Sequence, residues 1–278
     1  MKLMKRTAIL VLSMLFCFSQ ADAQKLVILH TNDTHSQIEP VRVGRTAGLG
    51  GVERRLQYIN SVRKEYGKRN VLLLDAGDFN QGTPYYTVCG GELEMDLMNA
   101  LKYDVLTLGN HEFDNGMEHL ANRLKRARYT TVACNYDFTG TPLEKHVKPY
   151  AIVRRGGMKI GIVGAAPRLE GVVAKSFLEG IVPLDGLEQI NRWADYLKEE
   201  KHCDLVILLS HLGYDGGSAE HPSDVLVAGA SHNIDIVVGG HSHTYLKKAK
   251  EVENLDGRVV PVVQSAGQGT VVGTFKIY

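Results

Sequence analysis

Short apolar runs alternate along the chain with longer stretches in which apolar residues recur every three or four positions. The runs cover residues 25–30, 71–74, 105–108, 131–135, 158–166, 205–209 and 234–238, and each has the length of a buried strand. The stretches with helical spacing cover residues 52–66, 93–101, 115–128, 187–200 and 223–230. Strands and helices in alternation predict an α/β domain whose parallel or mixed sheet is covered by helices. Residues 258–278 predict two closing strands around a glycine turn.

Two of the predicted helices carry patterns that matter for later packing. In the helix over 52–66, one face is apolar and is predicted to face the core: Val52, Leu56, Ile59 and Val62. The helix over 115–128 ends in a basic run that resembles a nucleic-acid patch, but a helix carboxyl end favours cations through its dipole. We therefore interpret this run as a solvated face, made of Arg123, Lys125, Arg126 and Arg128.

Residues with metal-binding side chains follow five of the predicted strands. They are Asp33 and His35, Asp78, Asn110, His211, and the pair His241 and His243. Ligands of open α/β sheets bind at the carboxyl ends of the strands, which meet at one edge. Each residue alone would fit an ordinary surface histidine or an Asx-turn. Five such strand ends in one chain predict a metal site.

The donor set indicates which metals this site would hold. Imidazole, carboxylate and amide ligands suit zinc, manganese or iron, whereas calcium takes oxygen ligands. Seven donors exceed the needs of one tetrahedral ion, while two divalent ions that share one carboxylate use all of them. Asp78 is the natural bridge.

A pair of divalent ions would suit the hydrolysis of a phosphate ester. Two cations about 3.5–4 Å apart lower the pKa of a shared water and neutralise the phosphoryl oxygens. The leaving oxygen then needs a proton, for which His111 is the candidate donor because it directly follows Asn110. Asp114 lies three residues further on and could hold the imidazole of His111 as a cation.

The amino terminus carries the pattern of an export signal. A basic start precedes the apolar run 8–18, and the small residues Ala21 and Ala23 follow. This pattern predicts a signal peptide over residues 1–23, cleaved after Ala23, and a periplasmic or secreted protein. A membrane anchor is the alternative, but the run is shorter than the ~20 residues that cross a bilayer, so no membrane span is expected. Residues 24–278 are then expected to form one catalytic domain.

Charge and cysteine content narrow the possible partners. The net charge is +1, and removing the three cations and one carboxylate of residues 1–23 leaves −1. Such a balance argues against generic binding to nucleic acid or to anionic membranes. The three remaining cysteines, Cys89, Cys134 and Cys203, allow at most one internal disulfide, whose pairing stays open.

The motifs, taken in order, resemble the calcineurin-like metallophosphoesterases. They are Asp33-x-His35, Gly77-Asp78, Gly109-Asn110-His111-Glu112-x-Asp114, His211 and Gly240-His241-Ser242-His243. The segments LHTNDTHSQ and GNHEFD are similar to the bacterial 5′-nucleotidase branch of that superfamily, and the resemblance extends over residues 26–278.

The resemblance implies a four-layer α/β/β/α sandwich of mixed sheets with a dinuclear metal site at the strand ends. It implies that Asp33, His35, Asp78 and His243 hold metal one. It implies that Asp78, Asn110, His211 and His241 hold metal two. His111 and Asp114 would form the catalytic pair.

Two departures from that branch affect the expected function. The branch often has Gln or Asn where His243 stands. Its full-length members also carry a carboxy-terminal domain that binds the base, and this sequence ends at Tyr278, where that domain would begin. Nucleoside recognition is therefore expected to be missing or to be supplied by a separately encoded partner domain.

The expected function is a secreted dinuclear phosphoesterase of nucleotide catabolism that hydrolyses phosphate monoesters, foremost 5′-nucleotides. One alternative is a phosphodiesterase that opens 2′,3′-cyclic nucleotides with the same ions. Another is a binding module that holds metal or nucleotide without turnover. The presence of both His111 and Asp114 disfavours the binding module, which needs no acid.

Overall fold

A computed structural model of the protein describes residues 26–218 and 220–278, so the predicted signal peptide lies outside the described residues. One sheet contains β1 (Leu26–Thr31), β2 (Val71–Asp75), β3 (Val105–Thr107), β4 (Thr130–Val132), β6 (Val147–Lys148) and β14 (Gly273–Ile277). The other contains β7 (Tyr150–Arg155), β8 (Met158–Ala165), β10 (Leu205–Ser210), β11 (Ile236–Val238), β12 (Lys250–Glu253) and β13 (Val259–Val263). A small ribbon pairs β5 (Tyr136–Asp137) with β9 (Val182–Pro183).

Helices lie between most of these strands along the chain. The α-helices are α1 (Val52–Tyr66), α2 (Pro84–Cys89), α3 (Glu92–Leu101), α4 (Met117–Leu124), α5 (Gly186–Asp195) and α6 (Asp224–Gly229). Short 3-10 turns are η1 (Lys68–Asn70), η2 (His111–Phe113) and η3 (Lys175–Phe177), and α5 continues into the π-helical turn η4 (Tyr196–Glu200).

Both sheets are mixed, as the alternation of strands and helices predicted. The strand order is β14-β1-β2-β3-β4-β6 in the first sheet and β12-β13-β11-β10-β8-β7 in the second. Only β14 runs antiparallel to its neighbour in the first sheet. In the second sheet β7 and β12, the two edge strands, are antiparallel to theirs. The parallel centres bring the carboxyl ends of β1, β2 and β3, and of β10 and β11, each to one edge.

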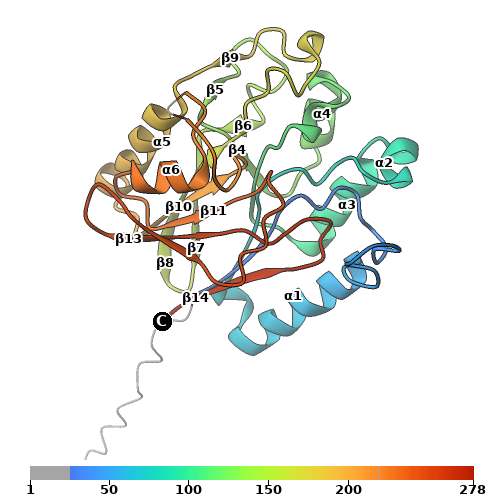
Figure 1. Ribbon diagram of the computed structural model, residues 1–278, viewed down its shortest axis with the longest axis horizontal. Helices are drawn as coiled ribbons and strands as arrows, with labels where there is room; N and C mark the ends of the chain where they lie inside the picture. The colour runs from blue at the N-terminus through green and yellow to red at the C-terminus, as the bar shows by residue number, and fades with distance from the viewer. Residues whose placement is uncertain (1–25, 219) are drawn as a thin grey trace, which may run out of the picture.

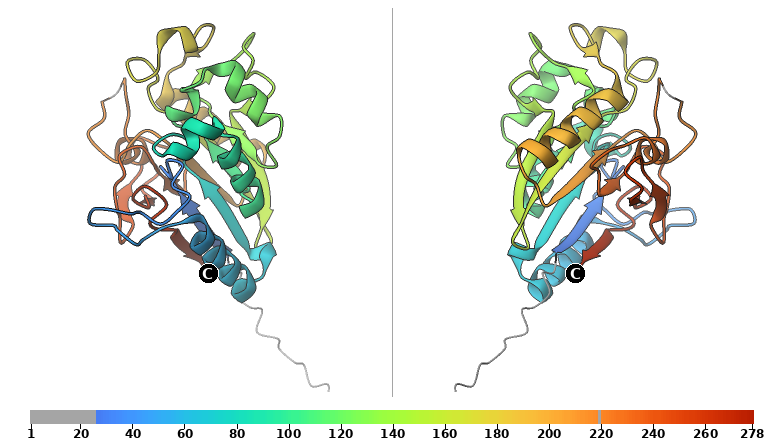
Figure 2. Two further views of the ribbon diagram at one scale, coloured as in Figure 1. Left: turned by 90° about the vertical axis from the view of Figure 1, so that its right-hand side faces the viewer. Right: turned by 90° about the vertical axis from the view of Figure 1, so that its left-hand side faces the viewer.

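The two sheets pack face to face, with helices on both outer faces (Figures 1 and 2). Because strand residues alternate between the two faces, Leu26 and Ile28 of β1 join the core between the sheets. Val27 and Leu29 point the other way and pack in the cluster of α1 and α3. On the far side, Val206 of β10 packs in the cluster of α5 and α6. The predicted four-layer α/β/β/α sandwich is therefore confirmed.

Two predictions about helix faces were wrong. In α1 the side chain of Leu56 is 38% exposed, while Arg55 is buried. The guanidinium of Arg55 lies beside Gly269, where an added Cβ would be 3.2 Å from Cζ of Arg55. Its charge acts on the buried side chains of Asp75 and Tyr103, an internal partnership that apolar periodicity does not show.

The second error concerns α4, which is shorter than predicted. Arg123, expected on a solvated face, is only 1% exposed. The other three residues of the basic run, Lys125, Arg126 and Arg128, are exposed as predicted.

Among the described residues there is neither a membrane-spanning helix nor a disulfide. Within residues 26–218 and 220–278, no helix combines the length and the apolar character that crossing a bilayer requires. Cys89, Cys134 and Cys203 are free thiols. Burial raises the pKa of the Cys134 thiol, so this residue is an inert core side chain.

Candidate metal centre

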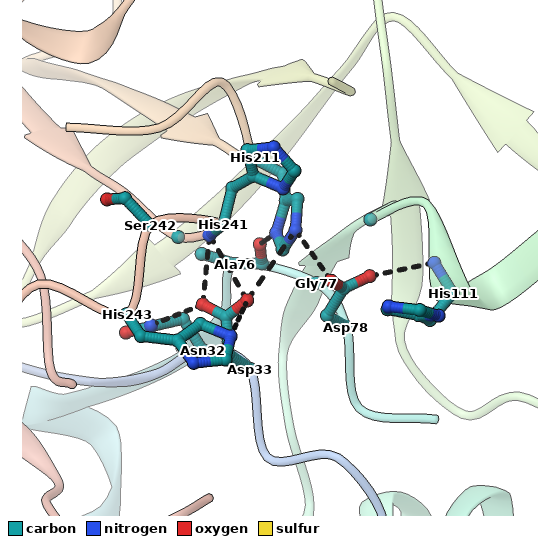
Figure 3. Close-up of polar contacts among 12 residues, drawn as sticks. Asn32, Asp33, Ala76, Gly77, Asp78, His111, His211, His241, Ser242 and His243 are labelled. Atoms are coloured by element: carbon teal, nitrogen blue, oxygen red, sulfur yellow. Dashed lines mark hydrogen bonds and ion pairs between the residues drawn. The ribbon is translucent and has the colours of Figure 1, made fainter. Parts of the chain in front are cut away.

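Six of the seven residues singled out by the strand ends have their donor atoms close together at one edge of the sandwich. Figure 3 shows five of them: Asp33, Asp78, His211, His241 and His243. From the first sheet, Asp33 and His35 follow β1, Asp78 follows β2, and Asn110 follows β3; from the second, His211 follows β10, and His241 and His243 follow β11. Four of these side chains are largely removed from solvent: Asp33, Asp78, Asn110 and His211. The structure therefore brings together six of the residues that the strand ends singled out, and Asn110 directly precedes His111, whose amide is bonded to Asp78.

The donor atoms form three overlapping groups, within each of which all atoms lie within 4.8 Å of one another. The groups are Asp33, His35 and His243; His35, Asp78 and His111; and Asp78, His211 and His241. Asp78 Oδ2 lies 3.1 Å from His211 Nε2, and Asp33 Oδ1 lies 3.3 Å from His243 Nε2. Asp78 thus belongs to two of the three groups, with His35 in one and with His211 and His241 in the other, as a shared carboxylate would.

Two buried atoms that could ligate a metal make no hydrogen bond, namely Oδ1 of Asn110 and Nε2 of His211. On the other side of its ring, His211 donates from Nδ1 to the carbonyl of Ala76. His35 Nδ1 likewise lies 3.3 Å from the carbonyl oxygen of Asn80. Because a carbonyl only accepts, each Nδ1 carries the proton and each Nε2 is the atom left for a ligand. The residues therefore fit a divalent metal, which would satisfy both orphaned atoms.

Opposite charges balance inside the cluster. Burial opposes a charge on His211, but the carboxylates of Asp78 and Asp33 raise its pKa to about 10. Burial also opposes ionisation of Asp33 and Asp78, yet His211 and the other histidines lower the pKa of both carboxyls. The carboxylates of Asp33 and Asp78 thus favour a positive charge at this position, which a bound divalent cation would supply.

Five of the seven residues adopt the left-handed backbone region that favours glycine. The φ angles are 49° at Asp33, 45° at His35, 55° at Asp78, 73° at His241 and 51° at His243. Such conformations cost of order 1 kcal/mol each in residues with a side chain and gather at functional sites. Their concentration here indicates that the loops are shaped for the side chains they present.

Three glycines allow these loops to approach one another closely. A Cβ on Gly77 would lie 2.6 Å from the amide nitrogen of Gly109 and 2.9 Å from His211 Nδ1. A Cβ on Gly240 would lie 2.8 Å from the same His211 nitrogen. A Cβ on Gly109 would overlap Asp78 Oδ1. No side chain fits at these three positions while the donor atoms stay where they are.

His111 stands beside the cluster with its own carboxylate partner. Its Nδ1 donates to Asp114 Oδ2 at 2.8 Å, and its backbone amide donates to Asp78 Oδ1 at 2.9 Å. The hydrogen bond to Asp114 raises the pKa of His111 above its ordinary value, against the effect of partial burial. The ring packs edge-on against His35 with centroids 5.4 Å apart. His111 is therefore an imidazole held in place at the rim of the candidate metal centre, with its protonated form favoured by Asp114.

Two further residues, Asn32 and Glu112, hydrogen-bond to the ligands or to their backbone, although sequence reasoning assigned them no role. Asn32 donates to Asp33 Oδ2 at 2.6 Å and accepts the amide of Ser265 at 2.9 Å, so it ties β1 to the loop after β13. Glu112 accepts backbone N–H groups from the segments after β2 and β3. The available signal was their position inside the two motifs, directly beside Asp33 and His111.

Two hollows flank the candidate metal centre. One, of about 440 Å³, includes His241, Arg168 and His221 in its wall. The other, of about 860 Å³, lies between residues 37–43 and α2, and has Gly82 in its wall, against which His35 packs. The first hollow, which has the donor residue His241 in its wall, offers room for the organic part of a ligand whose charged group reaches the cluster.

Comparisons with known proteins agree with this geometry. Human 5′-nucleotidase is 35% identical over 281 residues, which are 92% of this chain and 47% of the human protein. The crystal structure of a 5′-nucleotidase precursor from Thermus thermophilus has a TM-score of 0.80 at 34% identity, over 91% of this chain and 51% of that one. The NAD nucleotidase of Haemophilus influenzae has a TM-score of 0.78 at 29% identity, over 91% and 52%.

This chain spans about half the length of each of these relatives. Residues 26–245, which include all seven donors, match the family described as calcineurin-like phosphoesterase. On this match, and on the sandwich that carries the site, the chain belongs to the calcineurin-like phosphoesterase family.

Proposed function

We propose that the chain is the catalytic domain of a phosphoesterase that hydrolyses phosphate monoesters, foremost 5′-nucleotides, with two divalent cations. Zinc, manganese or iron are the metals that the donor set favours. Asp33, His35, Asp78 and His243 would hold one ion, and Asp78, Asn110, His211 and His241 the other. The observation that carries the proposal is that Asp78 belongs to two groups of metal-binding donors, with His111, held by Asp114, beside it.

When bound, the two cations would supply an activated nucleophile and neutralise charge on the phosphoryl oxygens. The chain itself supplies the proton for the leaving oxygen. His111 is fixed through Nδ1 by Asp114, so its Nε2 is the atom that gives up the proton. Its backbone amide is bonded to Asp78, which keeps the acid at a constant position relative to the metals. Together these contacts hold the acid in one orientation relative to the proposed metal site.

Support for a nucleotide substrate comes from the relatives, whose names describe 5′-nucleotidases and an NAD nucleotidase. The match covers about half of each relative. We assign recognition of the nucleoside to a second domain, carried either by the same polypeptide or by a separate chain. Without it, the domain described here should hydrolyse small phosphate monoesters with a high KM.

We also propose that the protein is exported to the periplasm or secreted. The support is the basic start, the apolar run 8–18 and the small residues before Gln24. The intact mass of protein recovered from the periplasm should equal that of a chain that begins at Gln24. A mass that retains residues 1–23 in a membrane fraction would indicate an anchor instead.

The direct test is a panel of phosphate esters with the metal-loaded protein. p-Nitrophenyl phosphate and AMP should be hydrolysed faster than bis(p-nitrophenyl) phosphate and 2′,3′-cyclic AMP. Faster hydrolysis of the diesters would establish a phosphodiesterase. No hydrolysis of any ester, with bound metal and with an added nucleotide-recognition domain, would leave only a binding module.

The role of His111 is tested by His111→Asn with His202→Asn as the matched control. His202 is exposed and precedes β10, at the opposite end of that strand from His211. His111→Asn should lower kcat by about 10²–10⁴-fold, the usual contribution of a general acid, while metal content stays that of the wild type. His202→Asn should leave both unchanged. Equal kcat values in the two variants would exclude His111 as the acid.

A further inference from the structure

A buried arginine lies behind the loop that carries Asp78. Arg123 of α4 is 1% exposed, and no carboxylate of the described residues lies within ion-pair distance of it. Its Nη1 donates to Asn80 Oδ1 at 3.0 Å, its Nη2 donates to the main-chain carbonyl of Glu112 at 3.3 Å, and its Nε has no partner. Burying a charge without a counter-ion is unfavourable, so we ask which function of the protein offsets the cost of burying Arg123.

The carboxylate of Glu112, whose main-chain carbonyl Arg123 contacts, accepts four backbone amides. Oε2 accepts the backbone amides of Asp78 at 2.8 Å and Gly109 at 2.7 Å, and Oε1 accepts those of Phe79 at 3.1 Å and Asn80 at 3.3 Å. These amides belong to two segments, one after β2 and one after β3. One fully buried side chain therefore fixes the distance between the segment that presents Asp78 and the segment that presents the next ligand.

Arg123 contacts the same two segments through hydrogen bonds of its own. One nitrogen of its planar guanidinium reaches the side chain of Asn80, and the other reaches the main chain of Glu112. A guanidinium holds two acceptors in one fixed geometry, which an ammonium group does not. Space for it is kept by Gly91, where a Cβ would overlap Nη1 and lie 2.9 Å from Cζ.

We propose that Arg123 and Glu112 are positioning residues for the metal centre. Glu112 fixes the Asp78 segment against the segment of Gly109 and Asn110, and Arg123 fixes Glu112 and Asn80 from behind. Neither side chain is a ligand in this assignment. The inference rests on the proposed function only for the identity of the metal ligands.

Metal affinity separates this role from a merely structural one. A buried residue that only stabilises the fold lowers Tm when replaced, and leaves the affinity of the folded protein unchanged. Replacing a residue that orients the ligands lowers metal affinity, typically by about 10–100-fold, even where the fold persists. Calorimetric titration with Mn²⁺ measures that affinity without any substrate.

The variants are Arg123→Lys, Arg123→Met and Glu112→Gln, with Arg128→Met as the matched control. Arg123→Lys keeps the charge but cannot span both acceptors, and the amide nitrogen of Glu112→Gln cannot accept an N–H. Arg128 belongs to the same basic run and is exposed. The first three variants should bind Mn²⁺ about 10–100-fold more weakly than the wild type, well below their own Tm. Arg128→Met should match the wild type.

Gly91→Ala provides a second route if the replacements at Arg123 do not fold. Its methyl group displaces the guanidinium without removing it, so Mn²⁺ affinity should fall in the same direction. Wild-type Mn²⁺ affinity in folded Arg123→Lys, Arg123→Met or Gly91→Ala would overturn the positioning role. If the wild type hydrolyses no ester but these titrations behave as expected, the proposed function fails and the positioning role stands.

Discussion

Replacement of Gly109 by alanine should displace the proposed bridging carboxylate directly. The added methyl group would overlap Asp78 Oδ1 and lie 2.6 Å from both Cγ and the backbone nitrogen of Asp78. Real Cβ atoms essentially never approach a neighbour closer than 3.0 Å, so the two groups must separate by at least 0.4 Å. Gly109 is not among the glycines with positive φ. The effect is therefore steric and comes without backbone strain.

The size of the effect follows from that displacement. A misplacement of about 1 Å in a catalytic site costs roughly 10²-fold in rate, so a shift of 0.4 Å or more should lower kcat by about tenfold at least. Overpacking of a buried contact also lowers the free energy of unfolding by about 1–3 kcal/mol. The protein should thus remain folded, with a displaced Asp78 and weakened binding of the metals.

The assay combines p-nitrophenyl phosphate turnover at saturating Mn²⁺ with a calorimetric Mn²⁺ titration. Gly229→Ala is the control, because a Cβ there meets its nearest neighbour, Cγ1 of Val252, at an ordinary 3.5 Å. The control should keep the wild-type kcat and Mn²⁺ affinity. Wild-type values for Gly109→Ala itself would refute the reasoning, since Asp78 could then move without consequence.

Four further outcomes are expected. Burial lowers the pKa of His30 from 6.5 to about 4, so the unfolded chain takes up a proton that the folded state resists. Stability is then fully present above pH 6.5 and falls as the pH approaches 4, by about 3 kcal/mol, and His30→Leu should remove this slope in urea unfolding at pH 7 and 4.5. Asp185→Ala removes the cap of α5, in which the carboxylate accepts the amide of Glu188 at 2.9 Å; the free energy of unfolding should fall by about 1 kcal/mol, and an unchanged urea midpoint would contradict this. Asp114→Asn should lower kcat by about 10²-fold at unchanged Mn²⁺ affinity, because His111 loses its anionic partner; a loss confined to Mn²⁺ affinity would instead make Asp114 a metal-site residue. Mn²⁺ at 100 times its dissociation constant should raise the free energy of unfolding by about 2.7 kcal/mol, and a chelator should abolish both this gain and hydrolysis.

The strand ends were readable from the sequence because each ligand follows an apolar run. Parallel strands bring their carboxyl ends to one edge, so residues as distant as Asp33 and His243 could be expected to meet. The apolar period of two also distinguishes the faces of β1, where Ile28 points between the sheets and Val27 points toward the helices.

The residues behind the ligands were not readable in this way. Glu112 bonds to backbone amides 32 to 34 residues away, and such amides leave no pattern in a sequence. Arg123 was placed on a solvated face because a cation is usually exposed, but it is buried and bonded to Asn80 of another element. Arg55 is buried as well, and its charge acts on the internal side chain of Asp75, which the apolar spacing of the helix does not reveal.

Anomalous diffraction from crystals grown with Mn²⁺ tests the central claim most directly. We predict two peaks roughly 3.5–4 Å apart with the carboxylate of Asp78 between them. His35 and His243 should be ligands on one side, and His211 and His241 on the other. A single peak, or two peaks that do not share Asp78, would contradict the account.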